Sequence, residues 1–139
     1  MPIQLTAEMR EKIGGARDAE LTCMLATVDI DGYPSLSYRG SMMVFDDDHL
    51  AYWDRSLRGA VAHMKANPKV GVWYRDPATR TAWRFIGDAI EYPEGPIRQQ
   101  VMDRTIQREL DADPERKGMA VLIKVTKVVD GRGQTVMER

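Results

Sequence analysis

The chain has 139 residues, of which 43% are hydrophobic and 29% are charged, and its formal net charge is −1. This length predicts one domain over residues 1–139, and the composition excludes a disordered tail or a fibre. The near-neutral charge argues against a nucleic-acid-binding protein, and no apolar run reaches the roughly 18 residues needed to cross a bilayer. With a single cysteine and no signal-peptide pattern, we expect a cytoplasmic protein that works without nucleic acid or membrane.

The first half of the chain is predicted to form one short helix and several strands. Apolar residues spaced four apart, with Thr6 as an N-cap and two glycines at the end, predict a helix over residues 6–14. An Asp-Gly pair at residues 31–32 predicts a hairpin turn between the first two strands. The strands are expected at Leu21–Val28, Pro34–Tyr38, Met42–Phe45 and His49–Asp54.

The second half is predicted to contain two helices and three strands. An i, i+3, i+4, i+7 apolar pattern from Leu57 to Met64 predicts a helix capped by Ser56. A second apolar pattern predicts one long helix from Ile97 to about Leu110. The strands are expected at residues 70–74, 81–92 and 119–129. Consecutive strands joined by tight turns indicate a mainly β (α+β) fold, in which six or seven antiparallel strands form a small barrel with flanking helices.

Conventional catalytic motifs are missing from the sequence. His49 and His63 have no partner at metal-ligand spacing and one cysteine cannot form a zinc cluster, so no metal site is expected. There is no phosphate loop and no dinucleotide-binding fingerprint, and no catalytic residue can be assigned. If the protein is an enzyme, a cofactor must carry its chemistry.

The middle of the chain combines positive charge with a favourable position for a phosphate. Residues 39–84 contain eight basic and five acidic residues, a balance of +3. Arg55, Ser56 and Arg58 lie where a predicted strand runs into a helix, so two guanidiniums, a hydroxyl and backbone N–H groups are available to an anion. Arg39 and Gly40 lie just upstream, and glycine lets the backbone approach a planar ring. The alternative is a well-capped helix with solvated arginines.

Five stretches carry a resemblance that covers about residues 6–129. They are Leu25–Val28, Asp31–Pro34, Leu50–Trp53, Asn67–Val72 and Phe85–Ala89. In this order and spacing they resemble the FMN-binding split-barrel family related to pyridoxamine 5′-phosphate oxidase. The resemblance implies a six-stranded split β-barrel that forms one flavin-binding domain. It also implies a homodimer with two flavin sites at the subunit interface.

The resemblance also implies which residues surround the flavin. The ring and ribityl chain would lie along the strand at Arg39–Met43 and at the end of the next strand, and Ser56 and Arg58 would hold the phosphate. In this chain Ala60 stands where the family usually has the phosphate-binding lysine. Trp73 alternates with valines in its strand and is expected to pack in the core. The predicted cofactor-binding residues are Arg39, Gly40, Ser41, Met42, Tyr52, Trp53, Asp54, Arg55, Ser56, Arg58 and Trp83.

Two functions follow from the resemblance. The first is an FMN-dependent oxidoreductase acting on an unidentified small molecule, with NADH or NADPH as a candidate electron donor and a 5-deazaflavin coenzyme as an alternative to FMN. The second is a non-catalytic protein of the same fold that binds flavin, deazaflavin or haem, or that responds to stress. The arginine-rich C-terminal segment of the true oxidase has no counterpart before Arg139, so we expect a substrate other than pyridoxamine phosphate.

Overall fold

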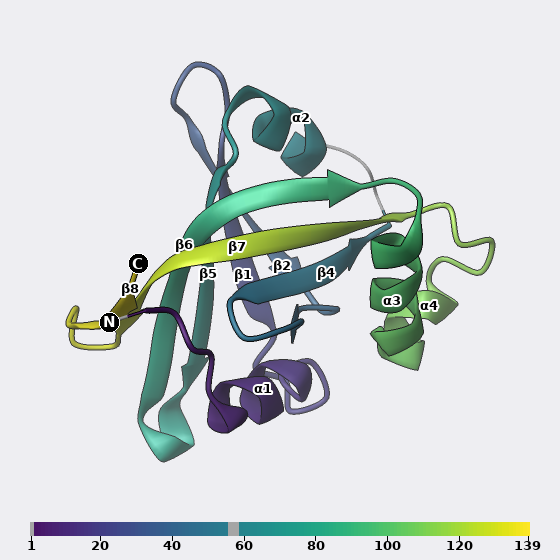
Figure 1. Cartoon of the computed structure of the whole chain (residues 1–139). Coiled ribbons are helices and arrows are strands. Elements are labelled where there is room, and N and C mark those ends of the chain that lie inside the picture. The colour runs from purple at the N-terminus through teal and green to yellow at the C-terminus, as the bar shows by residue number, and fades with distance from the viewer. Residues whose placement is uncertain (1, 56–58) are drawn as a thin grey trace.

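The computed structural model describes residues 2–55 and 59–139, and it shows a strongly curled antiparallel sheet with helices around it (Figure 1). The strands are β1 (Cys23–Val28), β2 (Pro34–Arg39), β3 (Met43–Val44), β4 (His49–Asp54), β5 (Lys69–Asp76), β6 (Thr81–Tyr92), β7 (Met119–Asp130) and β8 (Thr135–Glu138). The helices are α1 (Ala7–Gly14), α2 (Gly59–Ala66), α3 (Pro96–Arg104) and α4 (Gln107–Asp111), with a 3₁₀ turn, η1, at Pro77–Thr79.

The eight strands form one sheet in the order β2-β1-β5-β6-β7-β4-β3, and β8 pairs with β7. Every strand pair is antiparallel. The path begins at β2 and ends at β3, which residues 40–42 join directly, so the sheet curls into a half-barrel. The predicted mainly β, antiparallel split barrel with flanking helices is confirmed, and β8 is a strand that the sequence analysis did not predict.

The curl depends on the two twelve-residue strands, β6 and β7. Their pairing shifts register between Ile86 and Gly87, and such a bulge bends a strand and increases its twist. The bend turns one face of the sheet inward around a core. Fully buried side chains on this inner face include Leu25, Val72, Phe85, Val121 and Ile123.

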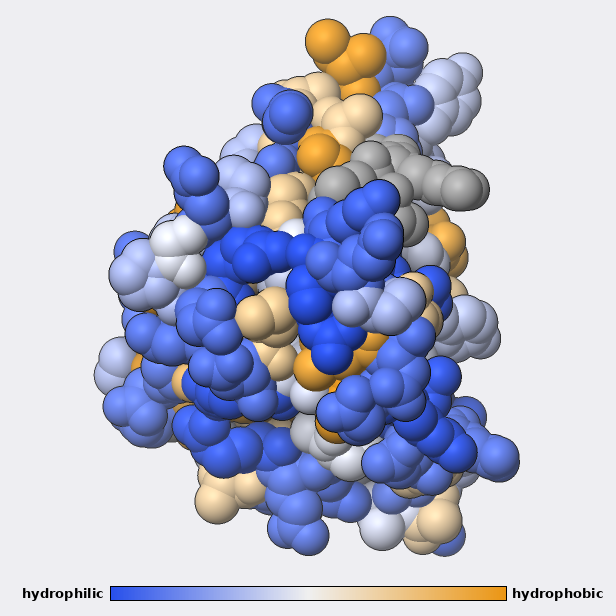
Figure 2. Space-filling view, turned by 90° about the vertical axis from the view of Figure 1, so that its right-hand side faces the viewer, coloured by the Kyte–Doolittle hydropathy of each residue, from blue (hydrophilic) through white to orange (hydrophobic). Residues whose placement is uncertain are grey.

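One helix covers this inner core, and two others form a second core. The Thr6 hydroxyl caps α1 by accepting a hydrogen bond from the Met9 N–H at 3.1 Å, and α1 buries Met9 and Ile13 against the inner core. Helices α3 and α4 pack on the opposite face of β4 and β7, where Val101 and Leu110 join a second core. The outer side of α3 and α4 is largely hydrophilic (Figure 2). Within the described residues, no helix is long and apolar enough to span a membrane.

The prediction of one long helix from Ile97 to Leu110 is wrong. The structure has two helices, because Thr105 and Ile106 both adopt extended backbone conformations. The Thr105 hydroxyl donates a hydrogen bond of 2.7 Å to the Val101 carbonyl, which competes with helix continuation. The break gives α4 its own direction and thereby brings Glu109 to the site described below.

The bulge makes Gly87 a specific requirement of the fold. A Cβ at this position would collide with the Lys124 backbone carbonyl, which cannot move without disturbing β7. We expect Gly87→Ala to lower the free energy of unfolding by about 1–3 kcal/mol, as overpacking does. Urea denaturation followed by circular dichroism measures this.

Gly71→Ala is the matched control for this prediction. Gly71 lies in the neighbouring strand β5, where the nearest atom to a Cβ would be the Ile86 Cδ1 at 3.7 Å, an ordinary van der Waals distance. This variant should unfold at a urea concentration close to that of the parent. Equal losses of stability in the two variants would contradict the role given to the bulge.

Candidate functional site

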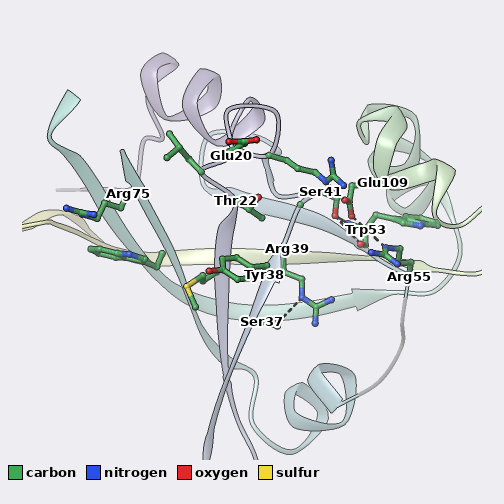
Figure 3. Close-up of a pocket in the computed structure, with 15 residues that line it drawn as sticks. Glu20, Thr22, Ser37, Tyr38, Arg39, Ser41, Trp53, Arg55, Arg75 and Glu109 are labelled. Carbon is green, nitrogen blue, oxygen red and sulfur yellow. Dashed lines mark hydrogen bonds and ion pairs between the residues drawn. The ribbon is translucent and has the colours of Figure 1, made fainter. Parts of the chain in front are cut away.

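A cavity of about 870 Å³ opens between the ends of β2, β4 and β5 and the loop after α1 (Figure 3). Its volume falls within the roughly 300–1,000 Å³ that is typical of small-molecule sites. Arginines outnumber acids in its lining, and aromatic side chains share its walls. The charged and aromatic lining residues are Arg17, Arg39, Arg55, Arg75, Glu20, Glu109, Tyr38, Trp53 and Trp73.

One wall of the cavity is the outer face of β2, β1 and β5. In the strand register Met24 lies between Tyr38 and Trp73, and the three side chains form one row. Tyr38 is 71% exposed and Trp73 is 37% exposed. The prediction that Trp73 packs in the core is wrong because side chains alternate along a strand, and the burial of Val72 sends Trp73 to the other face.

Arg39 ends β2 and is tied to the end of β4. Its guanidinium lies 3.5 Å from the carboxylate of Asp54, which is fully buried, and 5.2 Å above the ring of Tyr52. Its Nε donates to the Ser37 hydroxyl at 3.2 Å, and in Figure 3 its side chain points away from Glu109. Arg39 therefore supplies positive charge to a buried carboxylate. The Tyr52 side chain is buried, and this burial raises the pKa of its phenol.

The turn at residues 40–42 is fastened to β4 by one hydroxyl. The Ser41 Oγ accepts a hydrogen bond from the Trp53 N–H at 2.9 Å and donates one to the Trp53 carbonyl at 3.0 Å. Met42, the next residue, is buried in the inner core. The Ser41 side chain therefore takes the place of a backbone pair where β2 ends and β3 has not begun.

Trp53 is held rigidly at one end of the cavity. Its indole N–H donates to Asp113 Oδ2 at 2.9 Å, and the Arg98 guanidinium stacks 4.8 Å from the ring centroid. Asp113 also accepts the backbone N–H groups of Lys117 and Gly118, each at 2.9 Å. Burial acts to raise the pKa of Asp113, but these hydrogen bonds favour the carboxylate and hold the pKa below its ordinary value.

An ionic bridge crosses the cavity lining beside Gly40. Glu109 Oε2 lies 2.6 Å from Arg17 Nε, and Glu109 Oε1 lies 3.8 Å from Arg55 Nε. A Cβ on Gly40 would lie 2.6 Å from both the Glu109 carboxylate and the Arg17 Cδ. A side chain at residue 40 would therefore have to push the flexible ends of Arg17 and Glu109 aside, and glycine lets the bridge pack directly against the turn.

The predicted site residues divide into three groups. Arg39, Gly40, Ser41, Trp53 and Arg55 line the cavity together. Behind the lining, in the buried interior, lie Met42, Tyr52, Asp54 and Trp83, with the Trp83 ring stacked 5.5 Å from that of Tyr74. Ser56 and Arg58, the predicted phosphate ligands, lie outside the described residues.

Sequence reasoning missed Arg17 and Glu109, which come from the loop after α1 and from α4. They are far apart in the chain, and neither belongs to a motif. The glycine at position 40, against which both side chains pack, is the nearest signal, but it does not identify them.

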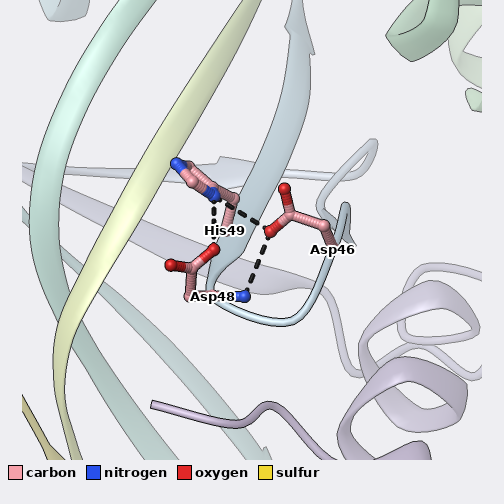
Figure 4. Close-up of side chains that lie close together, drawn as sticks. All are labelled: Asp46, Asp48 and His49. Carbon is pink, nitrogen blue, oxygen red and sulfur yellow. Dashed lines mark hydrogen bonds and ion pairs between the residues drawn. The ribbon is translucent and has the colours of Figure 1, made fainter. Parts of the chain in front are cut away.

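A second cluster lies at the turn between β3 and β4, and it does not line the cavity (Figure 4). His49 Nδ1 lies 2.9 Å from Asp46 Oδ1 and 2.8 Å from Asp48 Oδ1. The Arg139 guanidinium, 3.0 Å from Asp48, is the main cause that holds the pKa of that carboxyl below its ordinary range. The sequence predicts no partner at metal-ligand spacing for His49, because only histidine and cysteine were considered as partners. Hydrogen bonds within the cluster and to Arg139 account for its arrangement.

Comparison with known protein families identifies the family of this chain. Residues 5–129 match the family described as pyridoxamine 5′-phosphate oxidase. The chain belongs to this family. No curated protein matches the sequence.

Solved structures of other proteins share the fold. An FMN-binding protein from Syntrophomonas wolfei is 17% identical with a TM-score of 0.70, and the match covers 89% of this chain and 86% of that one. HutZ, the haem storage protein of Vibrio cholerae, is 20% identical (TM-score 0.67, covering 92% and 96%). General stress protein 26 from Bacillus anthracis is 15% identical (TM-score 0.68, covering 95% and 99%). Identities this low establish the architecture alone.

The contacts of Trp53 predict a pH-dependent stability. The lowered pKa of Asp113 means that its carboxylate stabilises the fold above the unfolded pKa of about 4 and loses this effect as the pH falls below that value. We expect Asp113→Asn to lower the free energy of unfolding at pH 7 by about 1–3 kcal/mol, with a shift in Trp53 fluorescence.

The difference between Asp113→Asn and the parent should shrink as the pH falls from about 4 to 2. Urea denaturation at a series of pH values measures it. Asp103→Asn is the control, because Asp103 is an exposed carboxylate of α3. A constant difference across this pH range would contradict the role given to the Asp113 carboxylate.

Proposed function

We propose that the cavity binds FMN and that the protein is a flavin-dependent oxidoreductase acting on a small molecule. The observation that carries this proposal is that arginines and flat aromatic side chains line one cavity of suitable volume, with Arg55 and Trp53 at one end and Arg75 at the other. Bound FMN would supply hydride transfer, which the protein's own side chains do not.

The residues present fit such a cofactor. Tyr38 and Trp73 offer an exposed aromatic wall for a ring, while Arg55, whose side chain is 50% exposed, offers a guanidinium to an anionic group. In this proposal the backbone N–H groups of Gly40 and Ser41, which line the cavity, would stabilise negative charge on the ring, whereas that of Met42 already donates to the Arg39 carbonyl at 3.4 Å. Glu109 is paired with Arg17, so a proton in the reaction would come from water or from the substrate.

Non-catalytic binding of flavin or haem is the second candidate. The pairing of Glu109, which leaves this carboxylate engaged rather than free as a base, favours a carrier role. Haem carries two carboxylates that the cavity arginines suit, but its iron also needs an axial ligand such as His, Met or Tyr. Among the described lining residues there is no histidine, so Tyr38 or Met24 would have to serve.

One parallel titration separates these candidates. The purified protein is titrated anaerobically with FMN, with a 5-deazaflavin coenzyme and with haem, and the loaded protein is mixed with NADH or NADPH. Submicromolar FMN binding, followed by bleaching and reoxidation in air, supports the enzyme. FMN binding without reduction supports the carrier, and a failure to bind FMN overturns the proposal.

The phosphate anchor can be tested by single substitutions. We expect Arg58→Ala to weaken FMN binding about 10- to 150-fold, because a charge-assisted contact contributes roughly 1.5–3 kcal/mol. Arg39→Ala should weaken binding too, but it should also lower stability, because Arg39 neutralises the buried Asp54. Fluorescence quenching of FMN measures the affinities.

Arg132→Ala is the control, because Arg132 is exposed in the turn between β7 and β8 and does not line the cavity. It should bind FMN like the parent. If Arg58→Ala also binds like the parent while Arg55→Ala does not, the phosphate lies at Arg55 instead. If no arginine substitution matters, the flavin assignment fails.

We also propose that the protein is a homodimer. The outer face of β2, β1 and β5 exposes Leu36 (66%) beside Tyr38 and Trp73, over a second hollow that Met24 and Ala26 help to line. This apolar face is continuous with the cavity, since Met24 and Trp73 line both. A second copy of the chain on this face would cover it and wall the cavity, whereas the largely hydrophilic side of α3 and α4 offers no comparable area (Figure 2).

Charge on this face should therefore dissociate the dimer. We expect Leu36→Glu to reduce the mass measured by light scattering from twice 15.8 kDa to 15.8 kDa at micromolar concentration. The control is Gln99→Glu, which adds the same charge on α3 and should leave a dimer. A monomeric parent protein would refute the proposal.

A further inference from the structure

We propose that Arg17 and Arg55 form an anion-binding subsite and that Glu109 occupies it as an internal ligand. A phosphate or carboxylate of a bound small molecule would then enter this subsite by displacing the Glu109 carboxylate. The proposal rests on the proposed function only in placing a ligand in this cavity, and it does not require that the ligand be a flavin.

The geometry of the bridge is that of a bound anion. The two oxygens of one carboxylate each face a different guanidinium, at 2.6 Å from Arg17 Nε and 3.8 Å from Arg55 Nε. Guanidiniums bind carboxylate and phosphate oxygens with the same planar arrangement of donors. The Glu109 carboxylate therefore lies where the anionic group of a ligand would bind.

The subsite remains accessible from the cavity. The side chains of Arg17 and Arg55 are 32% and 50% exposed, whereas that of Glu109 is 11% exposed. Within residues 2–55 and 59–139, the guanidiniums of Arg17 and Arg55 make no other ion pair, so their terminal N–H groups are available to a ligand. An anion can approach both cations without opening the core.

Charge balance makes the two anions competitors. Two guanidiniums and one carboxylate leave a single positive charge, which favours an incoming anion. Two anions in direct contact with the same cations repel each other, so a phosphate dianion and the Glu109 carboxylate cannot both hold this position at low cost. In this proposal the Glu109 side chain swings away from the arginines, while buried Leu110, the next residue, keeps α4 anchored.

Substitution at residue 109 tests the competition, because the two possible roles of Glu109 predict opposite results. If Glu109 competes with the ligand, Glu109→Gln frees the arginines and phosphate binds more tightly. If Glu109 instead holds the arginines in place for the ligand, the same substitution weakens binding. Calorimetric titration of the full chain with inorganic phosphate, at fixed pH and ionic strength, measures the affinity.

We expect Glu109→Gln to tighten phosphate binding about tenfold, since a charge-assisted contact is released. The control is Glu20→Gln, which removes the same charge from the same cavity, where no ion pair joins Glu20 to any described cation. It should change the affinity less than twofold. In a variant that already carries Arg17→Met, Glu109→Gln should give little or no gain in phosphate affinity. Circular dichroism on each variant checks that it is folded.

The proposal is overturned if Glu109→Gln binds phosphate no more tightly than the parent, or if Glu20→Gln shows an equal gain. Repeating the titration with FMN-saturated protein identifies the source of the anion. Loss of the phosphate site indicates that the flavin phosphate fills it, and its persistence indicates the anionic group of a second ligand. If Glu109→Gln binds phosphate more tightly but the protein does not bind FMN, the anion-binding subsite stands and only the flavin assignment is refuted.

Discussion

The pairing of β6 with β7 determines where the other elements of this protein lie. β7 bonds to β6, β4 and β8, and β6 carries β5 and through it the β1–β2 hairpin. The bulge at Gly87 bends this pair, and the sheet follows it into a half-barrel around a single inner core. The two ends of the strand order, β2 and β3, are thereby brought to one turn of the chain.

The cavity is a consequence of the open seam between the two ends of the sheet, where β2 passes into β3. At residues 40–42 the chain passes from one sheet edge to the other, and the Ser41 hydroxyl replaces the backbone pairing that is missing there. The Glu109 bridge packs against the same turn, and Trp53, near the end of β4, is hydrogen-bonded to it. The sheet thus supplies two walls, while α4 supplies the Glu109 carboxylate that pairs with Arg17 and Arg55.

Local patterns in the sequence predicted most strands because each has a clear signal. β4 and β6 begin and end as expected, and the sequence marks them because an acidic turn precedes β4 and proline-containing turns flank β6. The break at Thr105 was missed because a hydroxyl that bonds its own helix leaves no mark in hydrophobic periodicity. Trp73 was misassigned because alternation fixes which side chains share a face but does not say which face is open. Arg17 and Glu109 could not be predicted, since only the tertiary structure brings them together.

We propose that a ligand enters the cavity at the seam between β2 and β4. Amide hydrogen exchange followed by mass spectrometry, with and without saturating FMN, tests it directly, because bound ligand slows exchange in the backbone that it covers. With FMN bound, we expect slower exchange in residues 17–24, 37–41 and 53–55 and no change in the turn at residues 131–134. Protection confined to other segments, with these three unchanged, would contradict it.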